Sequence, residues 1–149
     1  MTRSGEPERA GLLHLVTANE DISVSQEHVV SEIVFPDGLV GLPALVRHRL
    51  SAIPETALYE MISSDDPTMG FIAAAADNVK PGTTDRLRDR GLVNDGEWVL
   101  AILAVHGEPA TITANLAGPI VVDLTTATAR QLVLEDIEFP LQAPVEEPS

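Results

Sequence analysis

Residues 98–116 read WVLAILAVHGEPATITANL, and they hold the clearest structural signal in the 149-residue chain. Residues 98–105 are apolar on both of their alternating faces, which predicts a central β-strand that is covered on both sides. Residues 107–109, Gly-Glu-Pro, then indicate a turn. Residues 110–116 alternate between apolar and polar side chains, which predicts a half-buried strand. Its predicted inward face consists of Ala110, Ile112, Ala114 and Leu116, and its outward face consists of Thr111, Thr113 and Asn115.

Short apolar runs separated by turn residues continue on both sides of this hairpin. They predict six further strands, at residues 29–35, 47–53, 57–62, 69–75, 119–123 and 129–134. Residues 83–91 differ, because they begin with threonines, carry an aspartate in the first turn and end in a glycine. That pattern predicts one short surface helix. Many short strands with regular turns indicate a mainly β domain, either a barrel or a sandwich.

The two ends of the chain differ from its middle. We expect residues 1–27 to form a poorly ordered N-terminal arm, in which residues 11–16 are the one apolar patch. Residues 28–142 are predicted to form the β domain, and residues 143–149 an acidic tail with two prolines. A chain of this length suits a single domain and can bury a core without disulfides or metals.

Charge is the strongest signal in the composition. Nine Lys and Arg residues stand against 23 Asp and Glu residues, which gives a net charge of −14. A surface this acidic repels phosphate backbones, so we expect no direct binding to nucleic acid. It favours basic protein partners instead, because it steers their approach. The absence of cysteine, of a signal peptide and of a membrane-spanning apolar run predicts an intracellular protein that does not insert into a membrane.

Catalytic patterns are missing from the sequence. The four histidines, His14, His28, His48 and His106, are scattered without the spacing of metal ligands, and no nucleotide-binding motif is present. The acidic pair Asp65 and Asp66 lies in a turn, where it can bind a cation or simply bond to backbone N–H groups. We therefore predict no catalytic residue, no cofactor and no metal site. A metal-dependent hydrolase that uses Asp65, Asp66 and a histidine, or a structural subunit of a larger assembly, are the alternatives.

Four segments of the chain resemble the FliW family of flagellar assembly factors. Residues 113–123, TANLAGPIVVD, with RQLVL shortly after them, resemble the T-x-N-L-x-A-P-I-x-x-N … Q-x-V-L stretch of that family. Residues 33–42, IVFPDGLVGL, resemble its I-x-F-x-x-G-I-x-G-F segment, and residues 64–72 resemble its S-x-D-x-x-x-x-F-I hairpin. Residues 139–141, FPL, stand where the family often has Y-P-L. The chain departs from the pattern at Gly118, where alanine is common.

The resemblance implies a single-domain, antiparallel β-barrel-like fold with very little helix. It also implies two mutually exclusive partners, flagellin and the translational repressor CsrA. We expect the protein to be cytoplasmic and monomeric when alone. Proteins of this family sequester CsrA when free flagellin is scarce, and this lifts the repression of flagellin translation.

The residues expected to contact partners belong to two of the matching segments. They are Ser64, Asp65 and Asp66 in one turn, and Thr113, Asn115 and Pro119 on the polar strand face and its adjoining turn, which we expect to be on neighbouring hairpins. An alternative stays open for Asn115 and Thr113, because such side chains also satisfy the backbone N–H groups of turns. Phe71 is expected to be buried in the core rather than to bind a partner.

Overall fold

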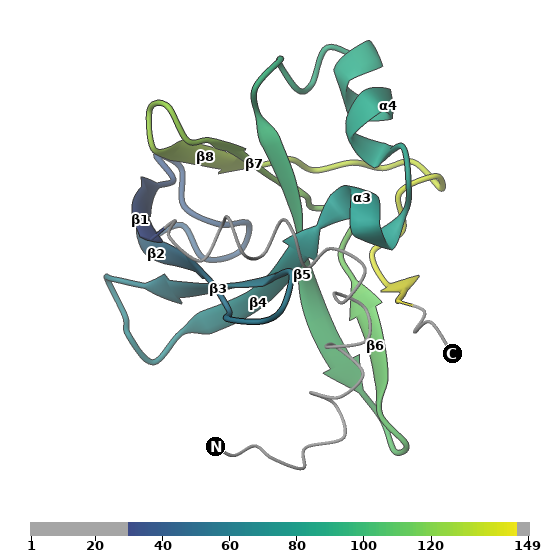
Figure 1. Ribbon diagram of the computed structural model, residues 1–149, viewed down its shortest axis with the longest axis horizontal. Coiled ribbons are helices and arrows are strands. Elements are labelled where there is room, and N and C mark those ends of the chain that lie inside the picture. The colour runs from purple at the N-terminus through teal and green to yellow at the C-terminus, as the bar shows by residue number, and fades with distance from the viewer. Residues whose placement is uncertain (1–29, 146–149) are drawn as a thin grey trace.

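The computed structural model describes residues 30–145. The elements in this part of the chain follow one another as shown in Figure 1. They are β1 (Val30–Val34), β2 (Arg47–Ala52), β3 (Leu58–Ser63), β4 (Gly70–Ala75), α3 (Ala76–Val79), α4 (Thr83–Asp89), β5 (Trp98–His106), β6 (Thr111–Ala114), β7 (Ile120–Asp123), β8 (Thr128–Gln131) and β9 (Ala143–Pro144). All eight predicted strands are present, with ends that differ from the prediction by up to three residues.

Seven of the strands close into a barrel. The order β4-β3-β2-β1-β8-β7-β5 returns to its start because β4 and β5 also pair. Neighbouring strands are antiparallel, except that β1 meets β8 in a short parallel contact at Val34 and Thr128. Closure leaves no open edge along most of the ring. The predicted mainly β, barrel-like fold is therefore confirmed.

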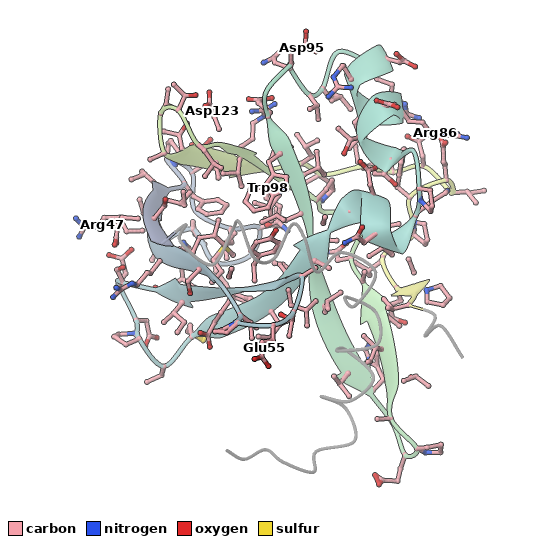
Figure 2. All side chains as sticks on the ribbon, viewed as in Figure 1. Arg47, Glu55, Arg86, Asp95, Trp98 and Asp123 are labelled. Atoms are coloured by element: carbon pink, nitrogen blue, oxygen red, sulfur yellow. The ribbon has the colours of Figure 1, made fainter. Side chains whose placement is uncertain are left out.

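Most buried apolar side chains form two clusters, one inside the barrel and one outside it. Side chains that point inward include Ile33, Phe35, Leu50, Met61, Leu100 and Ile120. Trp98 packs edge-on against Tyr59 on the inner side, with ring centroids 4.7 Å apart (Figure 2). The second cluster lies under the helices and includes Leu87, Val93, Val99, Leu116, Val121 and Phe139.

Strand β5 contributes to both clusters over residues 98–103, but not at its far end. Leu100 is buried inside the barrel, and its neighbours Val99 and Ala101 are buried in the second cluster. The prediction that β5 is covered on both faces is confirmed there and wrong at its far end, where Ala104 and Val105 are exposed. The reason is visible in Figure 1: β5 and β6 extend beyond the barrel as a projecting hairpin.

The prediction of one helix needs correction, because the described residues contain two. Helix α4 is the predicted helix, and it ends with Arg90 as its C-cap. Helix α3 adds a single turn directly after β4, with no side chain capping its N-terminus. A four-residue helix without a cap leaves almost no local signal.

The predicted start of the tail at residue 143 is too early. Ala143 and Pro144 form β9, which pairs with Ala114 and Thr113 of β6. Ala143 is buried, and the N–H of Val145 donates to the carbonyl of Ile112. The β domain therefore continues at least to Val145. The predicted arm, residues 1–27, lies outside the described residues.

Candidate functional site

The turn between β3 and β4 contains the first group of predicted contact residues. The hydroxyl of Ser63 accepts hydrogen bonds from the N–H groups of Asp65 and Asp66, which shapes the turn. The carboxylate of Asp66 accepts from the N–H and the hydroxyl of Thr68. Ser64 is exposed and donates its hydroxyl to Glu32 of β1. These polar groups therefore stabilise the turn and connect it to the barrel.

Asp65 has a defined electrostatic role in the same turn. Its Oδ2 atom accepts from the N–H groups of Arg47 and Val46, each at 2.9 Å. These two backbone hydrogen bonds, helped by the charge of Arg47, hold the pKa of Asp65 below its usual range. The exposed carboxylate therefore stays ionised near neutral pH and ties the turn to the start of β2.

The second group of predicted contact residues, Thr113, Asn115 and Pro119, is largely occupied by hydrogen bonds or burial within the protein. The hydroxyl of Thr113 lies 2.9 Å from Nε2 of His106, on the neighbouring strand. Pro119 is buried, and its carbonyl accepts from the N–H of Leu132. The side-chain oxygen of Asn115 accepts from the N–H of Gly118 at 2.8 Å. The sequence left open whether Asn115 binds a partner or satisfies the backbone of its own turn. The hydrogen bond from Gly118 shows that the side-chain oxygen of Asn115 satisfies the turn.

The structure does not bring the two predicted groups together on neighbouring hairpins. In Figure 1 the β3–β4 turn lies at the left of the molecule, and β6 lies at the lower right. Arg47, the partner of Asp65, also points away on the left side of Figure 2. Strand β5 lies between the β3–β4 hairpin and β6 in the sheet. The β3–β4 turn is at one end of that hairpin, and β4 pairs with β5 at the other end.

Instead, a surface groove forms around Val133. It encloses about 240 Å³, and we refer to it as the Val133 groove. The lining includes Val40, Asn115, Gly118, Gln131, Val133 and Leu141. Val40, Val133 and Leu141 are 59%, 66% and 63% exposed. Three of the seven large apolar side chains exposed between residues 30 and 145 thus line one groove, and such clustering is typical of interaction sites.

Gln131 organises the polar part of this groove. Its side-chain amide donates to the carbonyl of Gly118 at 2.9 Å, and its side-chain oxygen accepts from the N–H of Val40 at 2.8 Å. The N–H of Gly118 in turn donates to Asn115. One glutamine therefore connects the loop that carries Val40 with the turn after β6.

Three of the four segments that resemble the FliW family meet at this groove. Residues 33–42 supply Val40, residues 139–141 supply Leu141, and residues 113–134 supply the rest. The fourth segment, the β3–β4 turn, lies apart. Sequence reasoning missed Val40, Gln131, Val133 and Leu141 as site residues. One feature of the sequence could have indicated this site. Residues 132–134, directly after β8, are all apolar, so one apolar side chain must point away from the core.

His48 is a further titratable residue, in the barrel wall. It is fully buried, it packs edge-on against Phe35, and neither ring nitrogen has a hydrogen-bond partner within residues 30–145. Burial lowers the pKa of His48, and the nearby charges of Asp65 and Glu32 oppose this only in part. Between residues 30 and 145, no group of three or more acidic or histidine side chains is arranged to hold a metal ion.

Comparison with known proteins identifies the family. The family model described as FliW protein matches residues 15–145 of the chain. The chain belongs to the FliW family. This match begins before the described residues and covers all of them.

Individual FliW proteins agree with this assignment. Flagellar assembly factor FliW 2 of Desulfotalea psychrophila is 30% identical over 122 residues, which cover 76% of this chain and 79% of that protein. Flagellar assembly factor FliW of Geotalea uraniireducens is 34% identical over 91 residues, which cover 57% of this chain and 56% of that protein. A crystal structure of the flagellar assembly factor FliW has the same fold, with a TM-score of 0.62 at 18% identity over 77% of this chain and 85% of that chain. No helix among the described residues is long and apolar enough to cross a membrane.

Proposed function

We propose that this protein is a flagellar assembly factor that binds flagellin and the translational regulator CsrA as mutually exclusive partners in the cytoplasm. The observation that carries the proposal is the FliW match over residues 15–145. When free flagellin is scarce, the protein sequesters CsrA and relieves its repression of flagellin translation. When free flagellin accumulates, it displaces CsrA, and repression returns. The mechanism needs binding alone, without a catalytic step or a cofactor.

The charge distribution supports a protein partner rather than RNA. Among the described residues, ion pairs compensate five arginines: Arg47, Arg86, Arg88, Arg90 and Arg130. Few positive groups are therefore left to meet a phosphate backbone, and the chain as a whole carries −14. A repressor that binds RNA must present a positive surface to it. The acidic protein attracts that surface and, once bound, opposes the approach of RNA.

The Val133 groove is the proposed contact surface, with Asn115 as the one originally predicted residue that lines it. Apolar side chains at the centre of a contact contribute most of its binding energy once water is excluded. The exposed turn residues Ser64 and Asp65 offer a separate, polar contact region on another side of the barrel. Thr113 and Pro119 are less suited to contact, because one is bonded to His106 and the other is buried.

Fluorescence anisotropy with labelled flagellin mRNA leader, CsrA, this protein and flagellin tests the proposal. We expect this protein to release the RNA from CsrA, and added flagellin to restore the CsrA–RNA complex. The association rate with CsrA should fall as salt rises, because charge steering is screened beyond about 10 Å at 0.1 M salt. Direct binding of the RNA by this protein, or RNA that stays on CsrA at saturating amounts of it, would refute the proposed role.

A further inference from the structure

Within residues 30–145, the chain that follows β8 has one backbone edge paired, and no group pairs with its other edge. The N–H groups of Leu132 and Leu134 donate to the carbonyls of Pro119 and Ala117. In an extended pair the intervening residue directs its N–H and C=O to the opposite side. That residue is Val133, and its backbone makes no hydrogen bond to any group within residues 30–145. A strand edge of this kind accepts the backbone of another extended chain.

Apolar side chains surround this open edge. Val133 itself is exposed. Val40 lies in a loop that is held by a hydrogen bond to Gln131. Leu141 follows Pro140, whose carbonyl accepts a hydrogen bond from the N–H of Leu116. Each anchoring contact is a hydrogen bond from the protein itself, so the groove exists before a partner arrives. Preorganisation of this kind reduces the entropy lost on binding.

Among residues 30–145, the charged side chains near the groove sum to a negative charge. A smaller hollow adjoins the groove at Val40 and Gln131 and includes Asp37 and Arg130. Arg130 is bonded to Glu97, and its guanidinium lowers the pKa of that carboxyl, so its charge is neutralised locally. Asp37 and Glu135, which directly follows Leu134, have no ion-pair partner within the described residues. A cationic side chain of a partner would therefore be attracted to these two carboxylates.

We propose that the Val133 groove binds an extended segment of a partner protein in which an apolar residue is flanked by lysine or arginine. The partner's backbone pairs with the N–H and C=O of Val133, and its apolar side chain lies between Val40, Val133 and Leu141. A second copy of this chain is disfavoured as the occupant, because it would bring the same acidic groups against each other. This inference rests on the proposed function in one respect: it specifies the kind of segment that flagellin or CsrA would present.

Selection from phage-displayed random dodecapeptides tests the inference on the full-length protein. Selected peptides should combine an apolar residue with neighbouring Lys or Arg, and they should lack acidic residues. Each is then measured against Val133→Asp and against Val105→Asp, a matched control at an exposed valine outside the groove. We expect binding to weaken about tenfold or more in Val133→Asp and to stay near the native value in Val105→Asp. Melting temperatures of both variants verify that they fold.

A peptide N-methylated at its central residue separates main-chain pairing from side-chain burial, and it should bind more weakly than its parent. Failure to select any peptide, or peptides that bind both variants equally well, would overturn the inference. So would peptides that cause association of two copies without occupying the groove. Flagellin and CsrA binding by the same variants distinguishes the two proposals. If both partners bind Val133→Asp normally, the inference fails and the proposed function stands. If peptides bind the groove but neither flagellin nor CsrA binds the protein, the proposed function fails and the inference stands.

Discussion

Substitution of Gly38 by alanine should destabilise the loop that carries Val40, and Gly41 provides a matched control in the same loop. Both glycines have positive φ angles, 69° for Gly38 and 82° for Gly41. A side chain in this left-handed region is strained at either position. The surroundings differ, because a Cβ atom on Gly41 meets nothing within 4 Å. A Cβ atom on Gly38 would lie 2.4 Å from the carbonyl oxygen of Pro43.

The expected free energies follow from this difference. The left-handed conformation costs about 1–2 kcal/mol for alanine at either site. At Gly38 the backbone of Pro43 must also retreat by about 1 Å to reach an ordinary contact distance. It is not free to do so, because the N–H and C=O groups of Leu39 and Leu42 bond to each other across the loop. Overpacking of this kind adds about 1–3 kcal/mol, so Gly38→Ala should cost about 2–5 kcal/mol in total.

Urea denaturation of the native protein, Gly38→Ala and Gly41→Ala measures the two effects. Hydrogen exchange adds a local readout, because the N–H of Val40 is protected by Gln131 and should exchange faster in Gly38→Ala. The Val133 groove should bind its partner more weakly in the same variant, since Val40 lies in this loop. Equal losses of stability in the two variants would refute the reasoning, because the contact with Pro43 would then contribute nothing.

Three further predictions concern individual side chains. Burial lowers the folded-state pKa of His48 below 6.5, so the unfolded chain binds the proton more tightly and stability falls as pH drops below 6.5. His48→Leu should lose this part of the pH dependence. Urea denaturation between about pH 8 and pH 5.5 gives the free energy of unfolding of both proteins as a function of pH. The two curves should converge at low pH if the native protein is the more stable one at pH 8, and diverge otherwise; parallel curves contradict the prediction. Asn115→Ala removes the acceptor for the N–H of Gly118 and should lower the free energy of unfolding by about 1 kcal/mol; an unchanged value means that water replaces this contact. Gly118→Ala places a Cβ atom 2.9 Å from the side-chain nitrogens of Asn115 and Gln131, which should displace the Gln131 amide and speed exchange at the N–H of Val40, whereas a native exchange rate there would show that both amides rotate without loss.

Local patterns determined most of the secondary structure before any tertiary contact was known. The alternation of residues 110–116 predicted which side chains face inward, and Ile112, Ala114 and Leu116 are buried, whereas Ala110 in the turn of the hairpin is exposed. This works because a period of two is a property of the extended backbone itself. The turn at Ser63–Asp66 followed from the same local chemistry, in which short polar side chains bond to neighbouring N–H groups.

The sequence by itself thus determined eight of the nine strands between residues 30 and 145, most of the turns, the acidic surface and the resemblance to the FliW family. Only the tertiary structure decided that β4 pairs with β5 to close the barrel, and that the far half of β5 leaves it. The Val133 groove is another feature that only the tertiary structure decided, because Val40 and Leu141 are about a hundred positions apart. The pairing of β1 with β8 and the hydrogen bond to Gln131 position Val40, and the hydrogen bond from Leu116 to Pro140 positions Leu141. Hydrophobic periodicity records which face of one element is buried, and it carries no information on which distant segment lies beside that element.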